Sequence, residues 1–336
     1  MRPRHSIASI VLAAAAVCTP VAPVDAFDTH RLIVEQFVTR MVENHAFDEA
    51  ALRKLLKAAH SQPSIIAAMD RPAEKAKSWF EYRSIFLTEK RIQGGADFWL
   101  VHRSELDQAS IHSGVEPEYL VAILGVETYY GRLMGNYRIL DALATLGFDY
   151  PARSKFFLDE LEQFLLLSRE ATIDPLEARG SYAGAMGAPQ FMPSNYRRYA
   201  IDASADGHID LWKNWPDVLA SVGNFFKEHG WILGEPVLAE AAVNPDKAKE
   251  LDGRKLSLAQ TVGALKIQGV NFDSTLPDDS PAMLIAVDEA NATHWRVGYK
   301  NFYVITRYNH STLYAMAVYD LATAIKQRIL AHDAPT

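Results

Sequence analysis

Apolar residues recur at helical spacing along most of the chain before residue 234, and one such stretch contains a carboxylate. Residues 119–124 form an apolar run, and Glu127 shares a helix face with Leu120 and Leu124 at i, i+4 and i+7. Gly131 follows closely enough to end this predicted helix. Glu127 therefore lies on the stripe that should face the core, where burial is expected to raise its pKa. An alternative is a half-exposed glutamate at a helix end, paired with a nearby arginine.

Similar periodicity predicts helices on both sides of this stretch. Residues 98–112 form one predicted helix that leads into it, and another is expected to open at Asn214-Trp215-Pro216. After Gly234 the pattern changes to short segments of β-forming residues separated by Gly, Pro, Asn and Asp. This pattern predicts a small antiparallel sheet, with strands at residues 237–238, 264–270, 283–287, 295–299 and 302–308.

The predicted fold class is mainly α, in the α+β sense. A helical part is expected at about residues 27–234, a β subdomain at about 235–310 and a closing helix at 313–331. Residues 27–336 are expected to form one catalytic unit.

The composition of the 336 residues is that of an ordinary globular protein, with 49% hydrophobic and 22% charged residues. The formal net charge is −7 and no block of Lys or Arg occurs, so no nucleic acid partner is expected. An acidic protein also gains little electrostatic attraction to anionic lipid. Membrane association is therefore expected only if the chain is lipidated.

Residues 1–26 have the pattern of a secretory signal peptide. Arg2 and Arg4 precede an apolar run at residues 7–17, which is too short to span a bilayer. Ala26 is the small residue expected before a cleavage site. The sequence therefore predicts a periplasmic protein whose mature chain starts at Phe27.

The only cysteine, Cys18, lies within the predicted signal peptide. Cleavage would leave a mature chain without a thiol or a disulfide, stabilised by packing. A rival interpretation makes Cys18 the lipidated N-terminus of an outer-membrane lipoprotein. Val17 before it is a poor match to the small residue that lipoprotein processing prefers, so the sequence favours cleavage after Ala26.

A glycine-rich stretch at residues 180–194 carries hydrogen-bonding side chains among small residues. Small residues allow a backbone to approach a ligand closely, and Ser181 and Gln190 suit the acetamido or hydroxyl groups of a sugar. The alternative is a tightly packed loop between helices. The pattern alone leaves both interpretations open.

Oxygen-bearing side chains follow the spacing of a calcium loop. The first, third, fifth and sixth positions of an EF-hand loop are matched by Asp202, Ser204, Asp206 and Gly207. The twelfth position is Lys213 in place of Glu, and Asp217 is close enough to supply the missing carboxylate. The alternative is an acidic turn that caps the following helix. Hard oxygen ligands in a flexible arrangement favour calcium over magnesium.

Residues 301–314 combine tyrosines with asparagines, in a predicted strand that runs into a polar turn. Aromatic and amide groups together suit sugar binding. The alternative is an ordinary strand end, which the pattern alone favours.

Taken in order, these stretches resemble the lytic murein transglycosylase B family. The resemblance covers nearly all of the predicted mature chain and rests on Ala68-Met69-Asp70-Arg71-Pro72, Ala122-Ile123-Leu124-Gly125-Val126-Glu127-Thr128, residues 180–194, Asp206-Gly207-His208-Ile209 and residues 301–309. It implies a lysozyme-like helical core with an added helical subdomain, a small β subdomain and one calcium site. It also implies cleavage of the β-1,4 bond between N-acetylmuramic acid and N-acetylglucosamine in peptidoglycan without water, which leaves a 1,6-anhydro end.

The resemblance further implies roles for individual residues. Glu127 matches the single catalytic acid/base of the family. Positions that line the glycan cleft match Tyr82, Ser181, Gln190, Tyr308, Asn309 and Tyr314. Arg153 matches one of two arginines associated with the stem peptide, and the other is Ala152 here. The calcium ligands match Asp202, Ser204, Asp206, the carbonyl group of His208, and Asp217.

Two rival functions remain at this level. A hydrolytic muramidase on the same fold would need a held water and a second carboxylate, for which Asp141 and Asp149 are nearest in sequence. A non-catalytic glycan-binding protein is disfavoured, because an idle buried carboxylate is costly. The expected partners are peptidoglycan glycan strands, with other cell-wall enzymes as further candidates, and no organic cofactor is expected.

Overall fold

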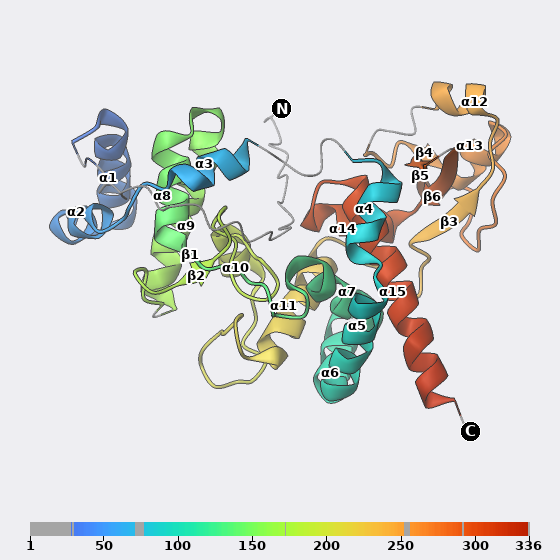
Figure 1. Ribbon diagram of the computed structural model, residues 1–336, viewed down its shortest axis with the longest axis horizontal. Coiled ribbons are helices and arrows are strands. Elements are labelled where there is room, and N and C mark those ends of the chain that lie inside the picture. The colour runs from blue at the N-terminus through green and yellow to red at the C-terminus, as the bar shows by residue number, and fades with distance from the viewer. Residues whose placement is uncertain are drawn as a thin grey trace. The chain divides into compact units, whose positions relative to one another are not determined.

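The computed structural model describes residue 28 and residues 30–70, 77–171, 173–251, 256–290 and 292–334. The predicted signal peptide, with Cys18 and the cleavage point after Ala26, lies outside the described residues. The chain divides into two compact units, each drawn from separate stretches of sequence (Figure 1). The described residues of Ala73–Tyr130 and Leu219–Thr336 form what we call the Glu127 unit, and those of Leu12–Pro72 and Gly131–Val218 form the Ser181 unit.

The Glu127 unit has a helical core around α7 (Pro117–Thr128). Every residue of α7 except Pro117 and Tyr119 is buried, as expected for a helix that is apolar on all sides. α7 packs against α15, and α15 also packs against α4 and α5. The other helices with residues in this core are α4 (Trp79–Phe86), α5 (Glu89–Val101), α6 (Arg103–Ser113), α11 (Trp215–Glu228), α14 (Lys300–Tyr308) and α15 (Thr312–Asp333).

The structure corrects two helix predictions in this unit. The single helix predicted at 98–112 is interrupted at His102, whose backbone (φ −110°, ψ 28°) leaves the helical region between α5 and α6. α7 ends at Thr128, because Tyr129 adopts a left-handed conformation with φ 53°. The next N–H, that of Tyr130, donates back to the carbonyl oxygen of Leu124 at 3.0 Å. Gly131, with φ 78°, shapes the following turn and does not itself end the helix.

The β part of the Glu127 unit contains a four-stranded antiparallel sheet in the order β3-β6-β5-β4. Leu284 of β5 lies opposite Val297 of β6, and both pack with Leu265 in one buried cluster. The elements are β3 (Leu238–Ala241), α12 (Pro245–Glu250), β4 (Gln260–Thr261), α13 (Val262–Ile267), β5 (Pro281–Asp288) and β6 (Thr293–Gly298). The predicted small antiparallel sheet is therefore confirmed.

Two of the predicted strands are wrong, because their residues are helical. Residues 264–270 overlap α13, and residues 302–308 lie within α14. Four of the six buried positions of α14 fall at i, i+3, i+4 and i+7, as Asn301, Val304, Ile305 and Tyr308. Valine, isoleucine and tyrosine favour strands by composition, but this 3.6-residue period gives α14 one face to bury, and α14 packs against α15.

The Ser181 unit surrounds α8 (Ile139–Asp149), which is buried from Ile139 to Phe148. α8 packs against α9 and α3. The short strands β1 (Tyr137–Arg138) and β2 (Arg179–Gly180) pair antiparallel beside it. The other elements are α1 (Leu32–His45), α2 (Glu49–Lys57), α3 (Pro63–Met69), the 3-10 helix η2 (Pro151–Arg153), α9 (Ser154–Glu170) and α10 (Pro193–Tyr199).

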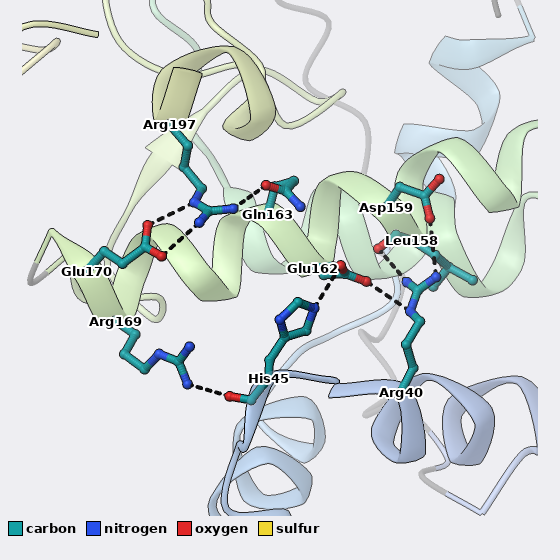
Figure 2. Close-up of polar contacts among 9 residues, drawn as sticks. All are labelled: Arg40, His45, Leu158, Asp159, Glu162, Gln163, Arg169, Glu170 and Arg197. Atoms are coloured by element: carbon teal, nitrogen blue, oxygen red, sulfur yellow. Dashed lines mark hydrogen bonds and ion pairs between the residues drawn. The ribbon is translucent and has the colours of Figure 1, made fainter. Parts of the chain in front are cut away.

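Charged side chains of α9 connect it to its neighbours in the Ser181 unit (Figure 2). Glu162 accepts contacts of 2.9 Å from both Arg40 and His45 of α1. Glu170 pairs with Arg197 of α10 at 2.7 Å. Partly exposed ion pairs contribute only about 0–1 kcal/mol each, so these contacts orient the helices more than they stabilise them.

Candidate active site

Glu127 lies in the last turn of α7 with its side chain buried. Only 8% of the residue is exposed, which excludes the half-exposed alternative. The Oη atom of Tyr314 donates a hydrogen bond of 2.6 Å to Oε1 of Glu127. Tyr314 lies in the first turn of α15, where the Ser311 side chain caps the helix by accepting the N–H of Tyr314. The helix cap therefore positions the phenol that contacts the carboxylate.

Tyrosine side chains surround this carboxylate. Burial and the nearby charge of Glu127 raise the pKa of the Tyr308 and Tyr314 phenols well above their ordinary value. Tyr82 adds to the effect on Tyr314. Both phenols therefore remain neutral at physiological pH and keep their protons for donation. The structure brings Tyr82, Tyr308 and Tyr314 into one cluster with Glu127.

Asn309 connects α14 to α15 and is fully buried. The backbone N–H of Ser311 donates to the carbonyl oxygen of Asn309 at 2.7 Å, which closes the turn between the helices. The polar turn predicted after Tyr308 therefore exists, although a helix leads into it and not a strand.

Ser181 and Gln190 belong to the Ser181 unit, where their side chains order the glycine-rich loop. The Oγ atom of Ser181 accepts the N–H groups of Ala183 and Ala185 at 3.3 and 3.0 Å. Gln190 adopts a left-handed backbone conformation with φ 53°, and its Nε2 donates to the carbonyl oxygens of Met134 and Gly187. A non-glycine residue in this conformation is uncommon and is held by its surroundings. The loop is thus a packed, preformed structure.

Arg153 lies in the 3-10 helix η2 of the same unit. Its guanidinium lies over the rings of Phe156 and Phe157, at 4.6 and 5.0 Å from their centroids. Burial lowers the pKa of the Arg153 guanidinium from its ordinary value. The group nevertheless stays charged at neutral pH, as arginine does.

The predicted calcium loop folds back on two carboxylates. Asp202 Oδ2 accepts the N–H of Gly207 at 2.9 Å, and Oδ1 accepts the hydroxyl of Ser204 at 3.2 Å. Asp206 Oδ1 accepts the N–H of His208 at 2.8 Å. The loop thus contains carboxylate and hydroxyl oxygens, which are hard donors of the kind that calcium prefers.

Asp217 closes this loop from the first turn of α11 and is fully buried. Its Oδ1 accepts the N–H groups of Ala203 and Ser204 at 2.9 and 3.0 Å, and its Oδ2 accepts that of Asp210 at 3.0 Å. Within the described residues, no three His, Cys, Asp or Glu side chains are grouped closely enough to hold a metal ion. The donor set fits calcium, and the site itself stays a prediction.

The two candidates for a second carboxylate are both engaged in the Ser181 unit. Asp141 lies in the fork of Arg138, with contacts of 2.7 and 2.8 Å, and Asp149 pairs with Arg31. Sequence reasoning missed the contact of Arg138 with His60, which is 2.6 Å long and joins residues 78 positions apart. No local pattern in the sequence could have revealed it.

Comparison with known families shows which family the chain belongs to. The chain matches the family described as "Transglycosylase SLT domain" over residues 30–323, which is most of its length. The chain belongs to the lytic transglycosylase family. The resemblance drawn from the sequence is therefore confirmed.

Relatives of this lytic transglycosylase include both a curated protein and solved structures. Membrane-bound lytic murein transglycosylase B of Escherichia coli (strain K12) is 42% identical over 300 residues, covering 87% of this chain and 82% of that protein. Soluble lytic transglycosylase SltB1 from Pseudomonas aeruginosa is 45% identical with a TM-score of 0.83, over 89% of this chain and 99% of that chain. Escherichia coli Slt35, solved in complex with calcium, is 40% identical with a TM-score of 0.81, over 91% and 96%. The predicted mainly α, lysozyme-like fold class is confirmed by these structures.

Proposed function

We propose that this protein is a peptidoglycan lytic transglycosylase in which Glu127 is the only acid/base. The observation that carries the proposal is the buried Glu127 carboxylate with the Tyr314 phenol 2.6 Å away. Membership of the lytic transglycosylase family supports the reaction class, and the curated relative is named for action on murein. The bond cleaved is the β-1,4 link between N-acetylmuramic acid and N-acetylglucosamine.

Glu127 would act first as an acid. The protonated carboxyl group gives its proton to the glycosidic oxygen while the bond from that oxygen to C1 of the muramic acid breaks. The carboxylate that results accepts the hydrogen bond of Tyr314, whose phenol is neutral and available as a donor. The positive charge that develops at C1 is balanced by the acetamido oxygen of the substrate itself.

Glu127 would then act as a base. The carboxylate removes the proton of the 6-hydroxyl group of the same muramic acid, and the oxygen closes onto C1. The product is a 1,6-anhydro ring, and Glu127 regains its proton for the next cycle. No water is consumed, so the reaction needs no second carboxylate to activate one.

The substrate-binding roles of the remaining residues are part of this proposal. Tyr82, Tyr308 and Asn309 would bind glycan in the Glu127 unit, and Ser181 and Gln190 would bind glycan in the Ser181 unit. Arg153, which carries a charge beside two phenylalanine rings, would contact the stem peptide. Ala152 stands where the family has a second arginine. We therefore expect weaker contacts with the peptide than in a protein that has both arginines.

Product analysis separates this proposal from a hydrolytic muramidase. Purified peptidoglycan is digested with the protein, and the released sugars are analysed by mass spectrometry. Muramic acid ends that are lighter by one water than hydrolytic products support the transglycosylase. Reducing muramic acid ends would favour the muramidase and reopen the search for a second carboxylate.

A structural calcium ion is the second part of the proposal. Asp202, Ser204, Asp206, the carbonyl group of His208, and Asp217 would hold it, and the calcium complex of Slt35 supports the choice of metal. The ion would tie the loop to α11. It would supply stability and take no part in bond cleavage.

The protein is proposed to be exported to the periplasm, where peptidoglycan is found. The basic and apolar pattern of residues 1–26 supports this location. The curated relative is membrane-bound, and among the described residues of this chain no helix has the length and apolar character to cross a bilayer. N-terminal sequencing of the exported protein tests the location: Phe27 at the terminus supports signal cleavage, and a lipid-modified Cys18 would make it a lipoprotein.

A further inference from the structure

The Ser181 unit contains a hollow of about 680 Å³ that the proposed function does not use. It is lined from the segment after α2, from β1, from the start of α8 and from the residues that lead into β2. A volume of this size lies within the range of small-molecule sites. Its lining carries two arginines and two carboxylates, Arg138, Arg179, Asp141 and Glu177.

The two arginines are directly opposite one another. In the register of β1 with β2, Arg138 pairs with Arg179, so the two side chains leave the same face of the strand pair. Like charges in this position destabilise a strand pair unless anions balance them. A two-residue ladder has little other stability to offset that cost.

One of these charges is neutralised within the protein. Arg138 donates to both carboxylate oxygens of Asp141, at 2.8 and 2.7 Å, and Asp141 is only 4% exposed. Arg138 also donates to Nδ1 of His60 at 2.6 Å. Because arginine can only donate, this contact leaves the proton of a neutral His60 on Nε2. On this side of the hollow, the positive charge of Arg138 is therefore already paired with the negative charge of Asp141.

The second arginine is not matched in this way. Arg179 is exposed and donates through its side chain to the carbonyl oxygen of Asn136 at 3.2 Å. Its own carbonyl oxygen accepts the indole N–H of Trp212 at 2.9 Å, which fixes the backbone. Among the described residues, no ion pair is found for Arg179 or for Glu177. Both side chains line the same hollow.

We propose that this hollow binds a zwitterionic amino-acid group, with Arg179 receiving its carboxylate and Glu177 its ammonium. A guanidinium suits a carboxylate because its N–H groups form a planar fork. Tyr137 and Leu176 add apolar surface for the carbon chain that leads to this charged group. In peptidoglycan such a group occurs in peptides that contain diaminopimelate, whose side chain ends in one carbon bearing both charges. The choice of this ligand rests on the proposed function, whereas the charge pattern does not.

The test is calorimetric titration of the mature chain with free stem peptides, which contain no glycosidic bond. The peptide with meso-diaminopimelate is compared with the same peptide containing lysine, which lacks the side-chain carboxylate. The diaminopimelate peptide is expected to bind about 10- to 100-fold more tightly, as one charge-assisted contact allows. Arg179→Ala should remove that advantage, and Arg179→Lys should keep part of it.

Glu177 is tested through the other charge of the ligand. Acetylation of the side-chain amine of diaminopimelate should weaken binding to the unmodified protein. It should have no further effect on Glu177→Gln, because the contact is already lost. The titration is repeated with free meso-diaminopimelate and with D-alanine. Weaker binding of both than of the peptide supports a peptide site, and equal binding would indicate a site for single amino acids.

Arg169→Ala is the matched control. Arg169 is also exposed in the Ser181 unit and donates to one carbonyl oxygen, that of His45, at 2.8 Å (Figure 2). Its loss should leave peptide affinity unchanged. Equal binding of the two peptides, an equal effect of Arg169→Ala, or no binding at millimolar peptide would overturn the proposal. Glu127→Gln should bind the peptides as the unmodified protein does. The result for the peptide site is therefore independent of the result for catalysis.

Discussion

The hydroxyl group of Tyr314 lies 2.6 Å from the carboxylate of Glu127, and the two residues are 187 positions apart in the sequence. Tyr314 is fully buried and Glu127 almost so. A hydrogen bond from a neutral donor to a buried carboxylate stabilises the ionised form. Glu127 must be protonated when it acts as an acid and ionised when it acts as a base. The hydrogen bond from Tyr314 stabilises the ionised form.

Tyr314→Phe is expected to lower kcat by about 10- to 100-fold, the value of one hydrogen bond to a charged group. Without this donor the carboxylate of Glu127 keeps its proton to higher pH, so the basic limb of the pH–rate profile should move to higher pH. The profile is measured with soluble glycan strands. Tyr319→Phe, on the same helix, is the control, and an unshifted profile for Tyr314→Phe would show that the phenol only fills space.

Glu127→Gln is expected to reduce turnover to near background. The amide keeps the size of the side chain but can neither give nor accept the proton, and general acid–base catalysis is worth about 10²–10⁴-fold for one role. Activity is measured as release of anhydro sugars, with glycan binding measured separately.

Glu118→Gln provides the matched control for this substitution. Glu118 is buried on the same helix and pairs with Lys326 at 2.6 Å, so its replacement should affect stability and not the chemical step. Substantial turnover by Glu127→Gln, or equal loss in both variants, would remove Glu127 from its assigned role.

Calcium is expected to raise the melting temperature of the protein and a chelator to lower it. A ligand that binds only the native state stabilises it by about 2.7 kcal/mol at a concentration 100 times its Kd. Asp206→Ala should abolish this response in thermal unfolding experiments. Asp174→Ala is the control, because Asp174 also accepts the N–H two residues on, at 2.8 Å, in an exposed turn. No shift with millimolar calcium would contradict the site.

Glu160 is expected to make stability depend on pH. Burial raises its pKa above the ordinary value of 4.5, although the Ser194 hydroxyl and N–H oppose this effect. A carboxyl group whose pKa is raised in the folded state contributes stability that is full below its unfolded pKa and is lost as the pH rises through its folded pKa. The free energy of unfolding, relative to Glu160→Gln, should therefore fall as the pH increases from about 4.5. Urea denaturation from pH 4 to 8 measures it, and a constant difference would refute the expected shift.

The local pattern of the sequence predicted much of the fold. The apolar stripe of α7 placed Glu127 on a buried face, and the polar turn before α15 was visible at Asn309. Prediction failed where composition and period disagreed: α14 has strand-forming residues, but its burial follows a helical period. It failed again at His102 and Tyr129, where single backbone conformations break or end helices that the apolar pattern would continue.

The sequence by itself determined which residues we propose for the chemistry, because helical spacing, loop composition and family motifs are all local along the chain. It could not supply the partners of those residues. The tertiary structure decided that Tyr314 contacts Glu127 and that Asp141 is held by Arg138 and by the backbone N–H of His60. It also decided that Arg179 lies opposite Arg138. Arg138 and Asp141 are only three positions apart, but the other pairs join distant parts of the chain. Those pairs form only when the helices and strands pack, and burial then sets their energies.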